Sequence, residues 1–252
     1  VDSIGGRIDQ PRLGGVQAPV GAVLGAALGV PVSVASHVDA MAGAELLLGS
    51  RPARRADHTS SLYVYARETV GFALVIGGQV HTPASGPGTV AGLPVRSGLL
   101  ADGYGHLEST VSDEAVVAAA RKAAILPATG PNSTIAALAR LARLARLDGA
   151  GISAAARDLL TERARVLGGA VALLRDLLNP DDLVVGGQAF TEYPEGLPAV
   201  RTAFSEGSLL APRDIRVTAF GNRVQEAGAG VVSLSSLYAD PLGALRRSRQ
   251  RC

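Results

Sequence analysis

The sequence has almost no cysteine and no tryptophan. Its 252 residues include one cysteine, Cys252, at the last position. A single thiol excludes a disulfide within the chain and any metal site built from several cysteines. Such scarcity is typical of a reducing compartment, so we expect a cytoplasmic protein. The four histidines lie in separate segments, and we therefore predict no metal site and no cofactor; they are His37, His58, His81 and His106.

A strong excess of charge of either sign is also missing. The formal net charge is +2 and the sequence pI is about 9.0, which does not by itself indicate a surface for nucleic acid. Hydrophobic residues make up 47% of the chain and charged residues 18%. This composition predicts a folded globular chain rather than a disordered one.

No hydrophobic run is long enough without interruption to cross a membrane. Residues 13–36 carry no charge, and about 20 apolar residues would suffice for a span. Gln17, Pro19, Pro31 and several glycines interrupt the stretch, so we expect a short helix and a strand there and no membrane partner. The chain shows no signal peptide and starts on Val1 rather than methionine, so we expect an upstream portion to be missing.

Hydrophobic periodicity and turn residues predict alternating helices and strands, which is typical of α/β layers. We expect strands at residues 31–35, 62–65, 71–75, 183–187 and 215–219. We expect helices at residues 19–29, 36–49, 112–126, 132–147, 153–178, 197–206 and 225–238. Gly77 and Gly78 are assigned to the turn of a hairpin between the second and third strands, and residues 80–105 are expected to be irregular.

Five segments, in this order, are similar to conserved blocks of one family. PVSVASHVDAMAGAELLLG (31–49) resembles PVxVENDANAAALAELxxG, and LYVYARETVGFALVIGGQV (62–80) resembles a hairpin built around GTGIGAGI. GTVAGLPV (88–95) resembles GEIGHLPV, GHLE (105–108) resembles GCLE, and LLRDLLNPDDLVVGG (173–187) resembles a helix, Asn-Pro, strand and Gly-Gly block. The family is the ROK family of repressors, uncharacterised reading frames and sugar kinases.

The resemblance implies an α/β fold of the actin-like ATPase (ribonuclease H-like) type with two lobes, the first of them truncated here. We expect residues 1–55 to form the end of the first lobe and residues 56–240 the second lobe, which would carry effector sensing and dimerisation. Residues 241–252 would form a basic tail.

The residues that would support sugar phosphorylation differ from the family pattern. His37 stands at the place of the aspartate that acts as general base in the family's kinases, and Asp39 follows two residues later. A histidine can act as a base, but a helix-start histidine beside its cap is the more ordinary interpretation. Ser36 and Asp39 form a capping-box-like pair, which accounts for Asp39 structurally. The position is therefore treated as degenerate, and no catalytic residue is assigned.

The phosphate, sugar and zinc motifs are altered as well. Only Gly71 remains of the glycines in the phosphate loop, which reads Arg67 to Ala73 here. Thr89 and Gly92 replace the Glu and His that hold the sugar in the family. His106 and Asp102 are all that remains near the zinc-binding segment, too few ligands for a tetrahedral site.

A glycine pair, Gly186 and Gly187, is kept from the nucleotide side of the family's site, although close packing between a helix and a strand explains such a pair equally. The candidate ligand-binding residues are therefore His37, Asp39, Thr89, Gly186 and Gly187.

One helix is both leucine-rich and basic. Its arginines could contact nucleic acid or an anionic membrane, or form a solvated face. They are Arg140, Arg143 and Arg146.

The resemblance and the lost motifs together predict a ROK-type transcriptional regulator: an effector-sensing, dimerising core without kinase activity. Its partners would be a second copy, as a homodimer or a dimer of dimers, a small-molecule effector, and DNA contacted through an upstream helix-turn-helix. Two alternatives stay open. One is a sugar kinase with altered catalytic residues, and the other is an oligomerisation scaffold that binds no ligand.

Overall fold

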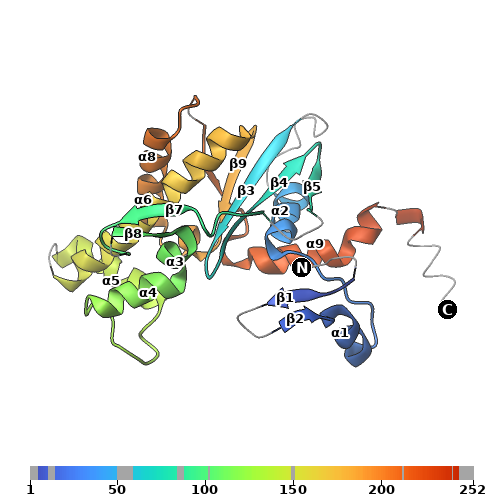
Figure 1. The fold of residues 1–252 in the computed structure, drawn as a ribbon, viewed down its shortest axis with the longest axis horizontal. Coiled ribbons are helices and arrows are strands. Elements are labelled where there is room, and N and C mark those ends of the chain that lie inside the picture. The colour runs from blue at the N-terminus through green and yellow to red at the C-terminus, as the bar shows by residue number, and fades with distance from the viewer. Residues whose placement is uncertain are drawn as a thin grey trace.

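The computed structural model describes residues 5–10, 15–49, 59–83, 88–101, 103–148, 151–211, 213–239 and 241–243. A mixed sheet of six strands lies at its centre, in the order β10-β9-β3-β4-β5, with β6 also paired to β4 (Figure 1). The strands are β3 (Ser60–Ala66), β4 (Val70–Ile76), β5 (Gln79–His81), β6 (Gly88–Thr89), β9 (Asp182–Gly186) and β10 (Arg216–Val217). The α/β class predicted from the sequence is confirmed.

Strand β3 lies in the middle of this sheet and explains its two-sided core. It pairs antiparallel with β4 and parallel with β9. Residues 62–66 are all buried, as expected for a strand covered on both faces. Because side chains alternate along a strand, Leu62 and Val64 point into one core and Tyr63 and Tyr65 into the other.

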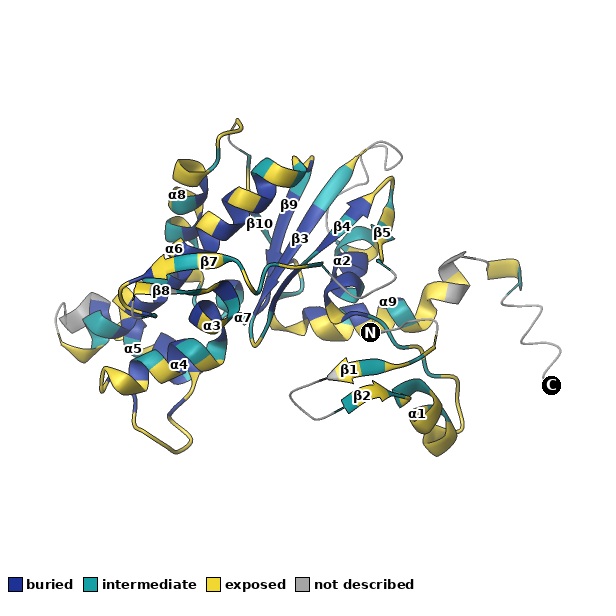
Figure 2. Ribbon diagram, in the orientation of Figure 1, coloured by how far each residue is buried: buried dark blue, intermediate teal, exposed yellow. Residues whose placement is uncertain are grey.

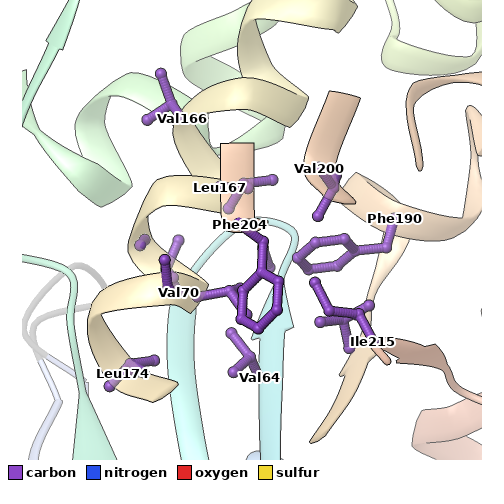
Figure 3. Packing of buried hydrophobic residues seen from close by; sticks show 14 of the residues in the cluster. Val64, Val70, Val166, Leu167, Leu174, Phe190, Val200, Phe204 and Ile215 are labelled. Carbon is purple, nitrogen blue, oxygen red and sulfur yellow. The ribbon is translucent and has the colours of Figure 1, made fainter. Parts of the chain in front are cut away.

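The first core lies between the sheet and α6 (Ile152–Leu178), α8 (Leu197–Gly207), α7 (Gln188–Thr191) and α3 (Leu107–Val111). Figure 3 shows the rings of Phe190 and Phe204 among Leu167, Val200 and Ile215. Gly168 on α6 and Gly207 on α8 let this helix pair approach closely, because a Cβ at Gly168 would overlap the carbonyl oxygen of Val200.

The second core covers the other face of the sheet. Helix α2 (His37–Leu48) lies on β3, β4 and β5, and α9 (Val224–Ala239) packs against α2. Gly228 of α9 sits over the backbone of Ala40 and Met41, where a Cβ would be about 3 Å from the nearest atoms. The last helix therefore returns to the residues that we expected to belong to the first lobe.

A smaller cluster forms at one end of α6, with α4 (Asp113–Lys122) and α5 (Ile135–Asp148). Val116, Leu138 and Leu160 are among its buried members. A buried ion pair between Arg163 of α6 and Asp113 of α4 joins this cluster to the first core, and Arg163 also donates to the carbonyl oxygen of Val111 at 2.8 Å.

The N-terminal elements have little core of their own. They are β1 (Ile8–Gln10), β2 (Gly15–Ala18) and α1 (Val20–Leu28). No residue of α1 is buried, and Val23 and Leu28 are mostly exposed (Figure 2). Among the described helices, none combines the length and apolar character needed to cross a bilayer.

Several sequence predictions were right in kind but wrong in detail. Gly77 and Gly78, with φ of 57° and 74°, turn β4 into β5, whereas the turn between β3 and β4 is formed by residues 67–69. Residues 80–105 are not simply irregular, because they include β6 and the paired strands β7 (Pro94–Ser97) and β8 (Gly103–His106).

The predicted strand at residues 31–35 does not form. A strand needs a partner to satisfy its backbone groups, and no described strand pairs with this segment.

Candidate functional site

The candidate base position lies where α2 begins beside the turn from β3 to β4. His37 follows the N-cap Ser36, and its ring meets Tyr65 edge-on with ring centroids 5.1 Å apart. Its Nε2 atom lies 3.5 Å from the hydroxyl oxygen of Thr69. Desolvation around the ring lowers the pKa of His37, opposed by the negative charge of Glu68. His37 is an exposed residue, and within the described part of the chain its ring contacts Tyr65 and Thr69.

Asp39 is the one candidate whose side-chain oxygens have no hydrogen-bond partner among the described residues. Its amide donates to the hydroxyl of Ser36 at 3.5 Å, which is half of the predicted capping box. The carboxylate makes no return bond, and both of its oxygens are buried without a hydrogen bond. Burial raises the pKa of Asp39 to about 6, and the positive charge of His81 on β5 partly opposes this. The capping hydrogen bond accounts for the backbone amide of Asp39, but it gives no structural role to the carboxylate.

Thr89 has a structural role at the position of the sugar clamp. Its hydroxyl donates to the carbonyl oxygen of Val70 at 3.2 Å and accepts from the amide of Ala91 at 3.1 Å. The amide of Val70 donates to Glu108 at 3.0 Å. Thr89 and Glu108 together hold the first residue of β4. Gly92 lies in open space, since a Cβ there would meet no atom within 4 Å.

The altered phosphate loop forms a turn whose side chains bond to one another and to α9. Arg67 lies 2.9 Å from the carboxylate of Glu68 through its Nε atom. It also donates to the side chain of Gln225 at the start of α9, at 3.4 Å, and Gln225 donates to the hydroxyl of Tyr65 at 3.1 Å. The turn is therefore tied to α9 by side chains rather than left open for phosphate.

The glycine pair after β9 is required by packing. A Cβ at Gly186 would overlap the hydroxyl of Tyr63, and one at Gly187 would overlap the carbonyl oxygen of Ala66. Gly187 also has a φ of 92°, which residues with a side chain rarely adopt. The geometry supports the packing interpretation of the pair without any nucleotide.

Four of the five candidate residues gather around the same turn. His37 and Gly187 both border Tyr65, Thr89 bonds to the first residue after the turn, and Gly186 lies one residue before Gly187. Asp39 is not part of this group, because the charged residue that acts on its carboxyl group is His81 on β5. The structure thus places the candidates together but leaves only Asp39 with unused polar atoms.

The altered zinc segment contains His106 at the start of α3, in a strand paired with β7. Among the described residues, no three His, Cys, Asp or Glu side chains gather closely enough to hold a metal ion. Asp102, His58 and the basic tail from residue 244 onward lie outside the described residues.

The predicted basic helix is used partly for internal contacts. Arg143 donates to Glu195 at 3.0 Å and to the carbonyl oxygen of Glu192 at 2.6 Å, and its guanidinium lies 5.8 Å from the centre of the Tyr193 ring. Arg140 is exposed, and the side chain of Arg146 lies outside the described residues. Arg143 therefore joins α5 to the segment before α8 rather than forming a free basic surface.

The sequence did not predict the hydrogen bonds that three polar side chains make around the site: those of Glu45, Glu108 and Gln225. Glu45 of α2 accepts from the hydroxyl of Thr218 and from the amide of Ala219, the latter at 3.1 Å. Gln225 and Glu108 were passed over because each acts on a residue distant in sequence. Two signals in the sequence could have pointed to them. Glu45 lies in segment 31–49, which resembles the family, and Glu108 is the last residue of GHLE.

The mixed sheet with helices on both faces defines an actin-like α/β fold, which the sugar kinases and the regulator compared below also have. Residues 2–238 match the model of the ROK family, and the chain belongs to that family. Among solved structures, a ROK family glucokinase of Streptomyces griseus in complex with glucose and AMPPNP has a TM-score of 0.68 at 21% identity, over 88% of this chain and 74% of that one. A ROK hexokinase of Thermus thermophilus has a TM-score of 0.67 at 25% identity, over 92% and 74%.

Two further comparisons concern regulators. A ROK family transcriptional regulator, a homologue of the Escherichia coli MLC protein, has a TM-score of 0.66 at 24% identity, over 92% of this chain and 59% of that one. Proteins of Mycobacterium tuberculosis and Mycobacterium bovis, each named a transcriptional regulator, are 68% identical over 248 residues. These residues are 98% of this chain and 56% of each relative, so the chain spans little more than half the length of these relatives.

Proposed function

We propose that this chain is the effector-sensing and dimerising core of a ROK-type transcriptional regulator and does not transfer phosphate to sugars. The relatives at 68% identity are named transcriptional regulators, which supports the regulatory role. DNA would be contacted by a part of the longer protein outside these residues, and a second copy would match the two-fold symmetry of an operator.

The proposed loss of kinase activity rests mainly on one residue, His37. By the resemblance of segment 31–49 to the family motif, His37 stands where the kinases have their general base, and its ring contacts Tyr65 and Thr69. Loss of a general base alone typically lowers the rate by about 10² to 10⁴. Thr89 and Arg67 add to this effect because both are bonded within the protein at the sugar and phosphate positions.

A coupled assay with ATP and a panel of hexoses tests the absence of catalysis. We expect no turnover near the 1 to 100 per second that is typical of kinases, for the natural chain and for His37→Asp alike. The matched control is His81→Asp, which places a new carboxylate away from the turn. Sugar-dependent turnover that is lost in His37→Ala would overturn the proposal and make the protein a sugar kinase with a replacement base.

The regulatory half of the proposal has a separate test. Helix-turn-helix spacing in the reading frame upstream of Val1 would support it. A continuous reading frame that instead encodes a second enzyme domain would contradict it.

A further inference from the structure

The hairpin of β7 and β8 occupies the segment that resembles the family's zinc site. It lies beside α6 and α3 (Figure 1). In the described residues of the hairpin, 94–101 and 103–106, His106 is the only His, Cys, Asp or Glu side chain. One such group is too few for a tetrahedral zinc site, so the hairpin depends on other contacts for its position.

Leu100 anchors the tip of the hairpin. It lies between β7 and β8 and is buried, at 8% exposure, in the apolar cluster of α4, α5 and α6. Its amide donates to the hydroxyl of Ser97 at 3.1 Å, and Ser97 is itself buried. Apolar contact is not directional, so this anchor alone does not fix how β7 is oriented on α6.

A polar cluster on α6 supplies the direction. Glu162 accepts from the Nε and Nη2 atoms of Arg165, both at 2.7 Å. The Nη2 atom of Arg165 also donates to the carbonyl oxygen of Arg96 on β7, at 3.3 Å. The pKa of Glu162 is lowered, first by the hydrogen bond from Arg165 and also by the side chain of Ser97, although partial burial opposes this. We call Glu162, Arg165 and Ser97 the hairpin clamp.

The hairpin clamp differs from an ordinary surface ion pair. Arg157 and Asp158 form such a pair between consecutive residues of α6, with 45% and 57% of their side chains exposed. Isolated pairs of this kind contribute little to stability, because water and salt screen their charges. The side chain of Glu162 is only 14% exposed, and its partner Arg165 reaches a backbone group of another element. Loss of the hydrogen bonds to such a carboxylate is therefore costly.

The hairpin leads directly into the candidate site. Strand β8 ends at His106, and α3 begins at Leu107, whose amide donates to the carbonyl oxygen of Leu93 at 2.8 Å. The next residue, Glu108, accepts from the amide of Val70 at 3.0 Å, at the start of β4. The contacts that fix the hairpin on α6 therefore also fix the carboxylate that holds this end of the turn.

We propose that the hairpin clamp holds β7 and β8 on α6 without a metal and so positions Glu108 at the turn between β3 and β4. Glu162 is a positioning residue, which acts through the hairpin and α3. The proposal goes beyond the regulatory role and depends on neither DNA nor a sugar, so the two can fail separately. It accounts for the shape of the candidate site in a chain whose residues do not fit a zinc ion.

Hydrogen–deuterium exchange of the whole protein, measured by mass spectrometry on peptides that cover β7–β8 and β3–β4, tests the hairpin clamp. Glu162→Ala should speed exchange in the hairpin by about 10- to 100-fold, the range expected when a hydrogen bond to a charged group is lost. The amide of Val70 should exchange faster as well. Glu162→Gln keeps a carbonyl acceptor and should have a smaller effect. Asp158→Ala removes a carboxylate from the same helix and should leave both peptides unchanged.

Ser97→Ala tests the hairpin clamp from the side of the hairpin and should also speed exchange there. Circular dichroism shows whether each variant keeps the fold, and Ser97→Ala decides the outcome if Glu162→Ala unfolds. A folded Glu162→Ala variant whose hairpin exchanges within about twofold of the natural rate would overturn the proposal and leave Leu100 as the anchor. Faster exchange of the natural hairpin on addition of EDTA would also overturn it, because a metal would then hold the hairpin. A hairpin that loosens while Val70 stays protected would overturn the link to the turn.

Discussion

Asp39 should make the protein less stable as the pH rises through about 6. In the folded chain burial raises its pKa to about 6 from the ordinary 3.8, and neither carboxylate oxygen has a hydrogen bond among the described residues. The folded state therefore holds this proton more tightly than the unfolded state. The associated stability is complete below about pH 4 and is lost as the pH rises through 6.

The size of the effect follows from the difference between the two pKa values. Each pKa unit corresponds to about 1.4 kcal/mol, so ionised Asp39 costs about 3 kcal/mol near pH 7.5 relative to the protonated form. Asp39→Asn removes the charge at nearly constant shape. We expect the variant to gain about 1 to 3 kcal/mol over the natural chain at pH 7.5, because the amide still lacks partners of its own. The part of the gain that comes from ionisation should fall to about a third at pH 4.5, because only below the unfolded pKa of 3.8 is it absent.

Urea unfolding followed by circular dichroism at pH 4.5, 6.0 and 7.5 measures this difference. Asp158→Asn, at an exposed position on α6, serves as the matched control and should show no comparable change with pH. An Asp39→Asn variant that is less stable than the natural chain at pH 7.5 would refute the reasoning. It would mean that the carboxylate has a partner, such as an ordered water, which compensates for its burial.

Two further changes follow from the site. Gly186→Ala should destabilise the fold by about 1 to 3 kcal/mol in urea unfolding, because the new methyl group overlaps the hydroxyl of buried Tyr63. Gly169→Ala on α6, where a Cβ meets no atom within 4 Å, should instead be neutral or stabilising by up to about 1 kcal/mol. Metal analysis of the purified chain should find no stoichiometric zinc, and one tightly bound zinc per chain would show that the ligands were misjudged.

Local signals in the sequence located most helices well. Ser36 and Gly49 correctly marked both ends of α2, and Asn179 ends α6 in the left-handed conformation before Pro180. These ends depend on residues within a turn of one another, so neighbouring letters suffice to predict them. The family resemblance then supplied the actin-like fold, which the local pattern alone would not have distinguished from other α/β arrangements.

Long-range contacts were beyond the same reasoning. The expected strand at residues 31–35 failed because a strand depends on a partner that the local sequence does not show. The bonds of Arg67 to Gln225 and of Glu45 to Ala219 join residues more than 150 positions apart. The structure places four of the candidate residues around one turn, but whether these residues bind a ligand stays a prediction, and the contacts that occupy each side chain could be seen only in the structure.

Gly186 and Gly187 show how a sequence signature can outlast its chemistry. Each glycine is constrained by a neighbour on β3, so selection for a stable sheet alone would keep both. A substitution at His37, which is exposed at the start of α2, meets no such constraint from the sheet. In families of this fold, a preserved glycine pair is thus poor evidence for nucleotide binding, and the identities at the base and sugar positions are the better guide to which members remain enzymes.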